Sequence, residues 1–180
     1  MNREVRSWLL GAGLVLASAL AIVSCGNKKS TIMGPTDPQV ETFPSEGQMH
    51  VPEGSPVTYN TDPPTSGAHY PSPWPGGFYD TEIAAGYLVH SLEHGAVVIY
   101  YNAPALTTAQ IDTLRARAAA HPGSFSQVVV VPRNDPVYPV ILTAWTHRLR
   151  LTSYAQNRID DFIGTFRGHG PENAAPVPRR

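Results

Sequence analysis

Two histidines and a glutamate lie together in the stretch Leu88–Gly95 and could bind a metal ion. His90 and His94 are four residues apart, so on a helix their side chains share one face, one turn apart. Glu93 stands beside the second histidine, and Gly95 is typical of a helix end. Paired imidazoles on one helix face suit a transition-metal ion. We therefore predict that His90 and His94 are metal ligands.

Two further histidines precede this pair and are candidate ligands. His69 lies in a loop rich in proline, glycine and aromatic residues, at positions 59–79, whose stiffness could hold the imidazole in place. His50 follows Met49 in a short alternating segment, and only one of these two side chains can face a given site. We predict His69 and His50 as additional ligands, and we expect Glu93 and Tyr70 to surround the ligands and orient them.

The available donor atoms restrict which metal could bind. Cys25 is the only cysteine of the chain, which excludes zinc-finger and iron–sulfur sites in the folded part. Three or four imidazoles suit copper or zinc, and we slightly favour copper. The expected role is scavenging, buffering or delivery of that ion.

Two alternatives remain open at this stage. The histidines could be structural, in a non-catalytic envelope module that binds a protein or a small ligand. His90, Glu93 and His94 also satisfy the pattern HxxEH of inverted zinc peptidases, with Glu172 as a distant third ligand. That pattern is short and Gly95 follows it at once, so we favour binding over hydrolysis and leave enzymatic activity undecided.

The elements that must position these residues follow from the apolar pattern. Strands are predicted at 96–101, 127–131 and 139–145, the last as an antiparallel neighbour in the sheet. A helix capped by Thr107 or Thr108 should run to about residue 120, and a second, capped by Thr152 or Ser153, should end near Gly168. Strand, helix and strand from 96 to 131 imply a right-handed crossover and a parallel pair. We predict an α+β or α/β domain with one mixed sheet and two main helices on one face.

The N-terminal residues predict export and lipidation. Arg3 and Arg6 precede an apolar stretch at 8–23, and Cys25 ends a sequence that matches a bacterial lipobox. We expect a signal peptide at 1–24, a lipidated Cys25 with a flexible tether to residue 47, a globular domain at 48–172 and a mobile tail at 173–180. The protein would then be anchored by lipid on the extracytoplasmic side of a membrane. Its formal net charge of −1 argues against binding nucleic acid.

Several motifs together resemble a known bacterial family. They are the loop at 59–70 (YNTDPPTSGAHY), the segment at 89–95 (VHSLEHG), the strand residues at 142–145 (LTAW) and the segment at 170–172 (GPE). This set is similar to the family called domain of unknown function 3105, over roughly residues 48–172. Ala68 stands where the family pattern usually has proline. The resemblance implies a secreted single domain and leaves the mechanism open.

Overall fold

Six β-strands form one mixed sheet in residues 38–172, the part of the chain that the computed structural model describes. The strand order across the sheet is β1-β6-β5-β3-β4-β2. The strands are β1 (Glu41–Thr42), β2 (Gly77–Phe78), β3 (Val97–Tyr101), β4 (Val128–Pro132), β5 (Val140–Ala144) and β6 (His147–Leu151). The predicted signal peptide, Cys25, most of the tether and the tail lie outside the described residues.

The centre of the sheet follows the sequence prediction. β3 and β4 are parallel, and helix α2 (Thr108–Ala120) connects them after the 3-10 turn Ala103–Ala105. A capping box between Thr107 and Gln110 starts α2, so Thr107 is the cap of the two that were predicted. β5 is antiparallel as expected, and its partner is β3 rather than the preceding strand β4. The mixed sheet and the single domain are therefore confirmed.

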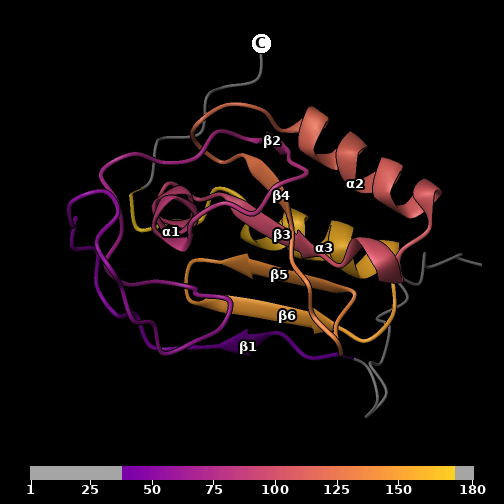
Figure 1. The fold of residues 1–180 in the computed structure, drawn as a ribbon, viewed down its shortest axis with the longest axis horizontal. Coiled ribbons are helices and arrows are strands. Elements are labelled where there is room, and N and C mark those ends of the chain that lie inside the picture. Colours follow the sequence, from indigo (N-terminus) through magenta and orange to yellow (C-terminus); the bar gives the residue numbers. More distant parts are fainter. Residues whose placement is uncertain (1–37, 173–180) are drawn as a thin grey trace, which may run out of the picture. The chain divides into compact units, whose positions relative to one another are not determined.

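The helices cover the two faces of this sheet unequally. α2 and α3 (Gln156–Phe166) share one apolar cluster with the inward residues of β3 to β6, including Leu114, Ile159 and Phe162. Leu88 and Leu92 of α1 (Ala85–Glu93) pack on the opposite face, against Val98, Tyr100 and Ile141. In Figure 1, α1 is seen end-on in front of the strands, and α3 lies behind them. The prediction of two main helices on one face is confirmed.

Three local features differ from the prediction. Residues 147–151 form β6, a separate strand beyond those predicted from the sequence. α3 begins at Gln156 with Ala155 as its N-cap and has no side-chain cap, so Thr152 and Ser153 do not start it. The segment 48–51 makes only an isolated parallel bridge, from His50 to His69. In addition, β1 lies within the residues that we assigned to the tether, and it pairs with β6.

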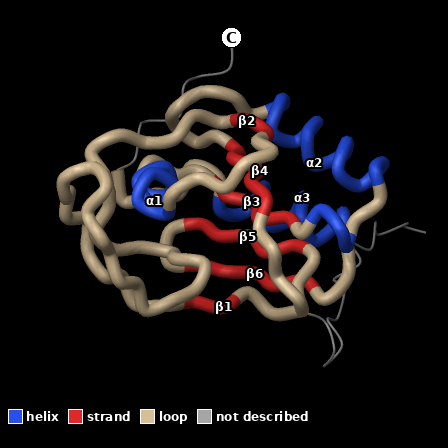
Figure 2. The backbone as a smooth tube through the Cα atoms, in the orientation of Figure 1, coloured by secondary structure: helices blue, strands red, loops and turns tan. Residues whose placement is uncertain are grey.

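Long loops surround α1 and fix its position. Figure 2 shows α1 enclosed by loop segments, whereas α2 and α3 lie beside the strands. The loop at 59–76 is hydrogen-bonded to α1: Tyr70 donates its amide to the Gly86 carbonyl, at 3.2 Å, and Trp74 donates its amide to Ser91 Oγ, at 2.8 Å. Within residues 38–172, the helices are too short or too polar to cross a membrane.

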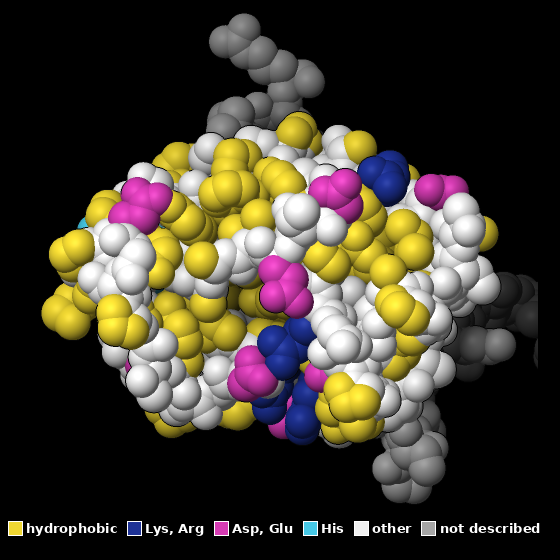
Figure 3. All heavy atoms as spheres, in the orientation of Figure 1, with side chains coloured by type: hydrophobic (Ala, Val, Ile, Leu, Met, Phe, Trp, Pro, Cys, Tyr) yellow, Lys and Arg dark blue, Asp and Glu magenta, His cyan; other side chains and the backbone are white. Residues whose placement is uncertain are grey.

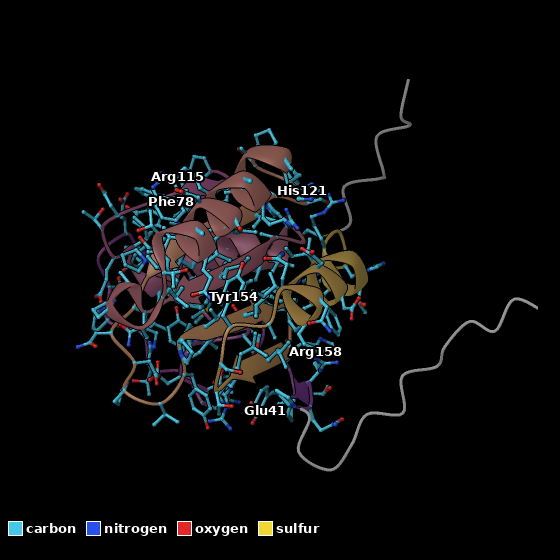
Figure 4. All side chains as sticks on the ribbon, turned by 90° about the vertical axis from the view of Figure 1, so that its right-hand side faces the viewer. Glu41, Phe78, Arg115, His121, Tyr154 and Arg158 are labelled. Atoms are coloured by element: carbon cyan, nitrogen blue, oxygen red, sulfur yellow. The ribbon has the colours of Figure 1, made fainter. Side chains whose placement is uncertain are left out.

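The surface over α1 and its loops also differs from the surface over α2 and α3. On the side in Figure 3, hydrophobic side chains surround a central hollow, and basic and acidic side chains gather below it. Figure 4 shows the side on which α2 and α3 lie next to each other, with Arg115 beside Phe78. A bidentate ion pair from Arg117 to Asp160 joins α2 to α3 there, at 2.6 and 2.8 Å.

Candidate metal centre

Helix α1 supplies three side chains to a buried polar cluster at its C-terminal end. His90 and Glu93 lie in its last turn and His94 is its C-cap. The apolar side of the helix is held by Leu88 and Leu92 against the sheet, which directs the polar side toward the loops. Gly95 follows with φ +78°, a conformation that glycine adopts without strain and that turns the chain into β3.

The preceding loops supply two more histidines through a short backbone pairing. The amide of His69 donates to the Met49 carbonyl at 3.0 Å, and the amide of Val51 donates to the His69 carbonyl at 2.8 Å. These bonds set His50 and His69 side by side, with ring centroids 4.9 Å apart. His69 is fully buried, whereas the His50 side chain is 50% exposed. The exposed side chain of Met49 lies outside the cluster.

One carboxylate oxygen is the centre of this cluster. Glu93 Oε2 is 3.0 Å from His69 Nε2, 3.9 Å from His50 Nε2 and 4.0 Å from His90 Nε2. Among the described residues, His50, His69, His90 and Glu93 form a group whose ligand atoms all lie within 4.8 Å of one another. Glu93 and His69 are almost completely shielded from solvent. The structure thus brings three of the four predicted ligands to one point.

The other nitrogen of two of these rings is held by the backbone. His69 Nδ1 is 2.8 Å from the Gly67 carbonyl oxygen, and His90 Nδ1 is 2.6 Å from that of Tyr70. A carbonyl oxygen only accepts, so both Nδ1 atoms must carry the proton. In the neutral ring Nε2 is then an acceptor. This is the arrangement that backbone carbonyls impose on histidines that bind a metal through Nε2.

This assignment leaves two acceptors facing each other. With the proton on Nδ1, a lone pair on His69 Nε2 would face the Glu93 carboxylate at 3.0 Å, a contact that is repulsive unless a proton or a metal ion lies between the two atoms. Burial lowers the pKa of His90, which keeps that imidazole in the neutral form that binds metals. The site is therefore rich in acceptors, buried, and suited to a cation.

His94 belongs to a neighbouring group. His94 Nε2 is 3.1 Å from His90 Nε2 and 3.0 Å from Glu172 Oε2, and its ring stacks on Phe125 at 4.3 Å. Glu93, His94 and Glu172 form a second set of converging ligand atoms. Glu172 arrives from the segment after α3, whose amides at Gly168 and Glu172 donate to the carbonyls of Gly95 and Glu93.

The structure places the predicted residues as follows. His50, His69 and His90 lie together, and His94 contacts His90 from the side. Glu93, which we expected around the ligands, lies among them and can itself bind the ion. Tyr70 contacts the site through its backbone carbonyl, while its hydroxyl donates to the Ser55 carbonyl at 3.2 Å.

The remaining histidines lie elsewhere. His121 is the C-cap of α2, and His147 and His169 have Nδ1 at 2.8 Å from carbonyls of nearby residues. Glu172 was not among the predicted ligands of the histidine site, since the sequence pointed to it only through the peptidase alternative and the family segment at 170–172. No local signal in the sequence connects it to His94.

Comparison with known proteins gives a family and no activity. The model of the family described as "Protein of unknown function (DUF3105)" matches residues 50–178. No curated protein and no solved structure matches the chain.

Proposed function

The chain belongs to this family of unknown function, DUF3105, and from that premise we propose that it binds a transition-metal ion through His50, His69, His90 and Glu93. The observation that carries the proposal is the convergence of three Nε2 atoms on the buried carboxylate oxygen of Glu93, at 3.0 to 4.0 Å. Two of these imidazoles have Nδ1 bonded to carbonyls, so their Nε2 lone pairs are available for the ion.

The ligand set favours copper or zinc. Three imidazoles and one carboxylate are borderline ligands that suit both ions, and at equal availability copper binds such ligands more tightly. The ring of His50 is half-exposed, so an ion can enter and leave the site past this residue. Exchange through that side fits scavenging, buffering or delivery of the ion.

A binding role is better supported than hydrolysis by the motif HxxEH. In an inverted zinc peptidase the glutamate activates water beside the ion. Here Glu93 Oε2 is directed at histidine nitrogens, and α1 is only nine residues long and ends against Gly95. These contacts favour Glu93 as a ligand rather than as a general base.

The proposal includes the location expected from the N-terminal residues. Arg3 and Arg6, the apolar stretch after them and Cys25 support a lipid anchor on the extracytoplasmic side of a membrane. A chain that lacks a fatty acid on Cys25 when isolated from bacterial membranes would contradict the anchor without affecting the metal site.

The test of binding uses the full chain, purified without a histidine tag and dialysed against copper or zinc. We expect His90→Ala to weaken binding by more than about 100-fold, because loss of groups that merely surround a metal already costs roughly 10- to 100-fold. His50→Ala, at a half-exposed position, gives a second variant that the fold should tolerate.

His169→Ala is the matched control, because His169 is exposed and bonded only to the adjacent turn of α3 among the contacts seen. Metal affinity is measured by competition with a chromophoric chelator. Absence of metal from the wild-type chain, or equal affinity in His50→Ala, His90→Ala and His169→Ala, would show that the site does not bind the ion.

A further inference from the structure

Glu93, His94 and Glu172 form a second group of possible metal ligands beside the first group, which consists of His50, His69, His90 and Glu93. The two groups have Glu93 in common. The ligand atoms of the second group lie within 4.8 Å of one another. All three histidine contacts of the first group go to Glu93 Oε2. A carboxylate has a second oxygen and can bridge two cations, as carboxylates do where two metal ions lie about 3.5 to 4 Å apart.

We propose that this protein binds a second divalent ion through His94 and Glu172, with Glu93 bridging the two ions. The inference rests on the proposed function, since the first ion is the one bound by His50, His69 and His90. His94 Nε2 faces two acceptors at once, His90 Nε2 at 3.1 Å and Glu172 Oε2 at 3.0 Å. His94 Nδ1 lies 3.4 Å from the Ser124 carbonyl oxygen, which places the ring proton on Nδ1 and leaves an Nε2 lone pair facing both acceptors. A cation on that side attracts the His94 lone pair and the Glu172 carboxylate together.

The position of Glu172 is built into the backbone. The Glu172 amide donates to the Glu93 carbonyl at 3.2 Å, and the Gly168 amide donates to the Gly95 carbonyl at 2.7 Å. A Cβ at Gly170 would lie 2.0 Å from the Glu93 carbonyl oxygen, so only glycine permits this approach. The carboxylate is thus held at the end of α1 by the segment that carries it, beside His94.

The two ligand sets differ in chemistry and access. Three imidazoles with one carboxylate favour copper or zinc at the first position, while two carboxylates with one imidazole form a harder set that favours zinc or manganese. The Glu172 side chain is 56% exposed, which leaves coordination positions on that side to water. The second ion should therefore bind more weakly than the first and exchange faster.

Zinc stoichiometry tests the inference. The full chain, purified without a tag, is dialysed against excess zinc, and bound zinc per chain is determined by mass spectrometry of the metal. We expect about two ions for wild type and about one for Glu172→Gln, which retains the shape of the side chain. Glu82→Gln, at another exposed glutamate, is the matched control and should retain two. Circular dichroism verifies that all three proteins are folded.

Each other outcome has a separate meaning. One ion in wild type, whether or not Glu172→Gln reduces it, overturns the second site and leaves the proposed function in place. Two ions in both wild type and Glu172→Gln overturn the role of Glu172. No ion in wild type overturns the proposed function itself, and the second site with it.

Discussion

Two glutamates, Glu41 and Glu93, each gather basic side chains, and the chemistry of the two clusters differs. Glu41, on β1, accepts hydrogen bonds from Arg148 and Arg150, with four N–O distances between 2.9 and 3.2 Å. Figure 4 shows Glu41 at the β1 edge of the sheet. Glu93, on α1, faces the Nε2 atoms of three histidines.

The difference lies in what each partner offers to the carboxylate. A guanidinium group has only donors and is always charged, so the two arginines satisfy both the charge and the hydrogen-bond acceptors of the Glu41 carboxylate. Hydrogen bonds from Arg148 are the main reason that the pKa of Glu41 is lowered. A histidine whose Nδ1 is held by a carbonyl offers a lone pair instead, so the cluster around Glu93 could hold a cation. Similar geometry therefore stabilises the fold at Glu41 and, under the proposed function, binds an ion at Glu93.

A change of pH should separate the Glu41 and Glu93 clusters by the largest effect, loss of the bound metal. Histidines bind metals only when neutral, so protons displace the ion as the pH falls below about 6.5. Burial lowers the pKa of His90, so protonation of this ligand, and the loss of metal it causes, should occur below that value. The lowered pKa of Glu41 acts at a different pH: its contribution to stability is present above the usual carboxyl value and is lost only at more acidic pH.

Dialysis at a series of pH values, followed by metal analysis and near-ultraviolet circular dichroism, separates the two clusters. At about pH 5 the protein should have lost nearly all its metal and kept its tertiary signal. Metal that remains bound at that pH, or a tertiary signal lost together with the metal, would contradict the comparison.

A smaller effect is expected from removing the charge of each carboxylate. Glu93→Gln should weaken metal binding by more than about 100-fold, since the amide is a poorer ligand than a carboxylate and loss of groups that merely surround a metal already costs roughly 10- to 100-fold. Glu41→Gln should leave the affinity unchanged and lower the free energy of unfolding by about 1 to 2 kcal/mol, because Arg148 is buried and loses part of its partner.

Chelator competition and denaturant unfolding, measured on both variants, distinguish these results. A loss of metal affinity in Glu41→Gln equal to that in Glu93→Gln would mean that the two clusters are not independent.

The smallest effect concerns the aromatic ring beside each cluster. Phe125 stacks on His94, with ring centroids 4.3 Å apart, and Arg148 lies over Phe43 at 4.9 Å. Phe125→Leu should lower the affinity for the second ion about threefold, since such stacking contributes roughly 0.5 to 1.5 kcal/mol. Phe43→Leu should leave zinc binding unchanged and reduce the unfolding free energy by about 0.5 kcal/mol. Zinc titration of both variants tests this, and identical affinities would remove Phe125 from the site.

Local patterns predicted the centre of the fold. The apolar runs of β3, β4 and β5 and the capped helix α2 depend on neighbours within a few residues, so their types followed from the sequence. The strand β6 was not predicted from the sequence, because Arg148 and Arg150 alternate with leucines and resemble a solvated strand end. Arg148 is buried, and its partners come from distant segments: Glu41, 107 residues away, and the Asp62 carbonyl.

In the candidate site, too, some features follow from local spacing and others depend on distant contacts. The spacing of His90, Glu93, His94 and Gly95 alone predicted a metal-binding turn, because residues four apart lie about one turn apart on any helix. That Glu93 points inward among the histidines depends on which side of α1 packs against the sheet, and this is set by contacts of Leu88 and Leu92 with distant strands.

The sequence by itself determined which residues can bind a metal, since donor type and helical spacing are local properties of the chain. Only the tertiary structure decided which of them meet. The backbone pairing of His50 with His69, the close glycine contacts that bring Glu172 to His94, and the Tyr70 carbonyl that orients His90 all join different segments of the chain. Such contacts depend on how loops close over the sheet, and loop closure leaves no periodic trace in the sequence.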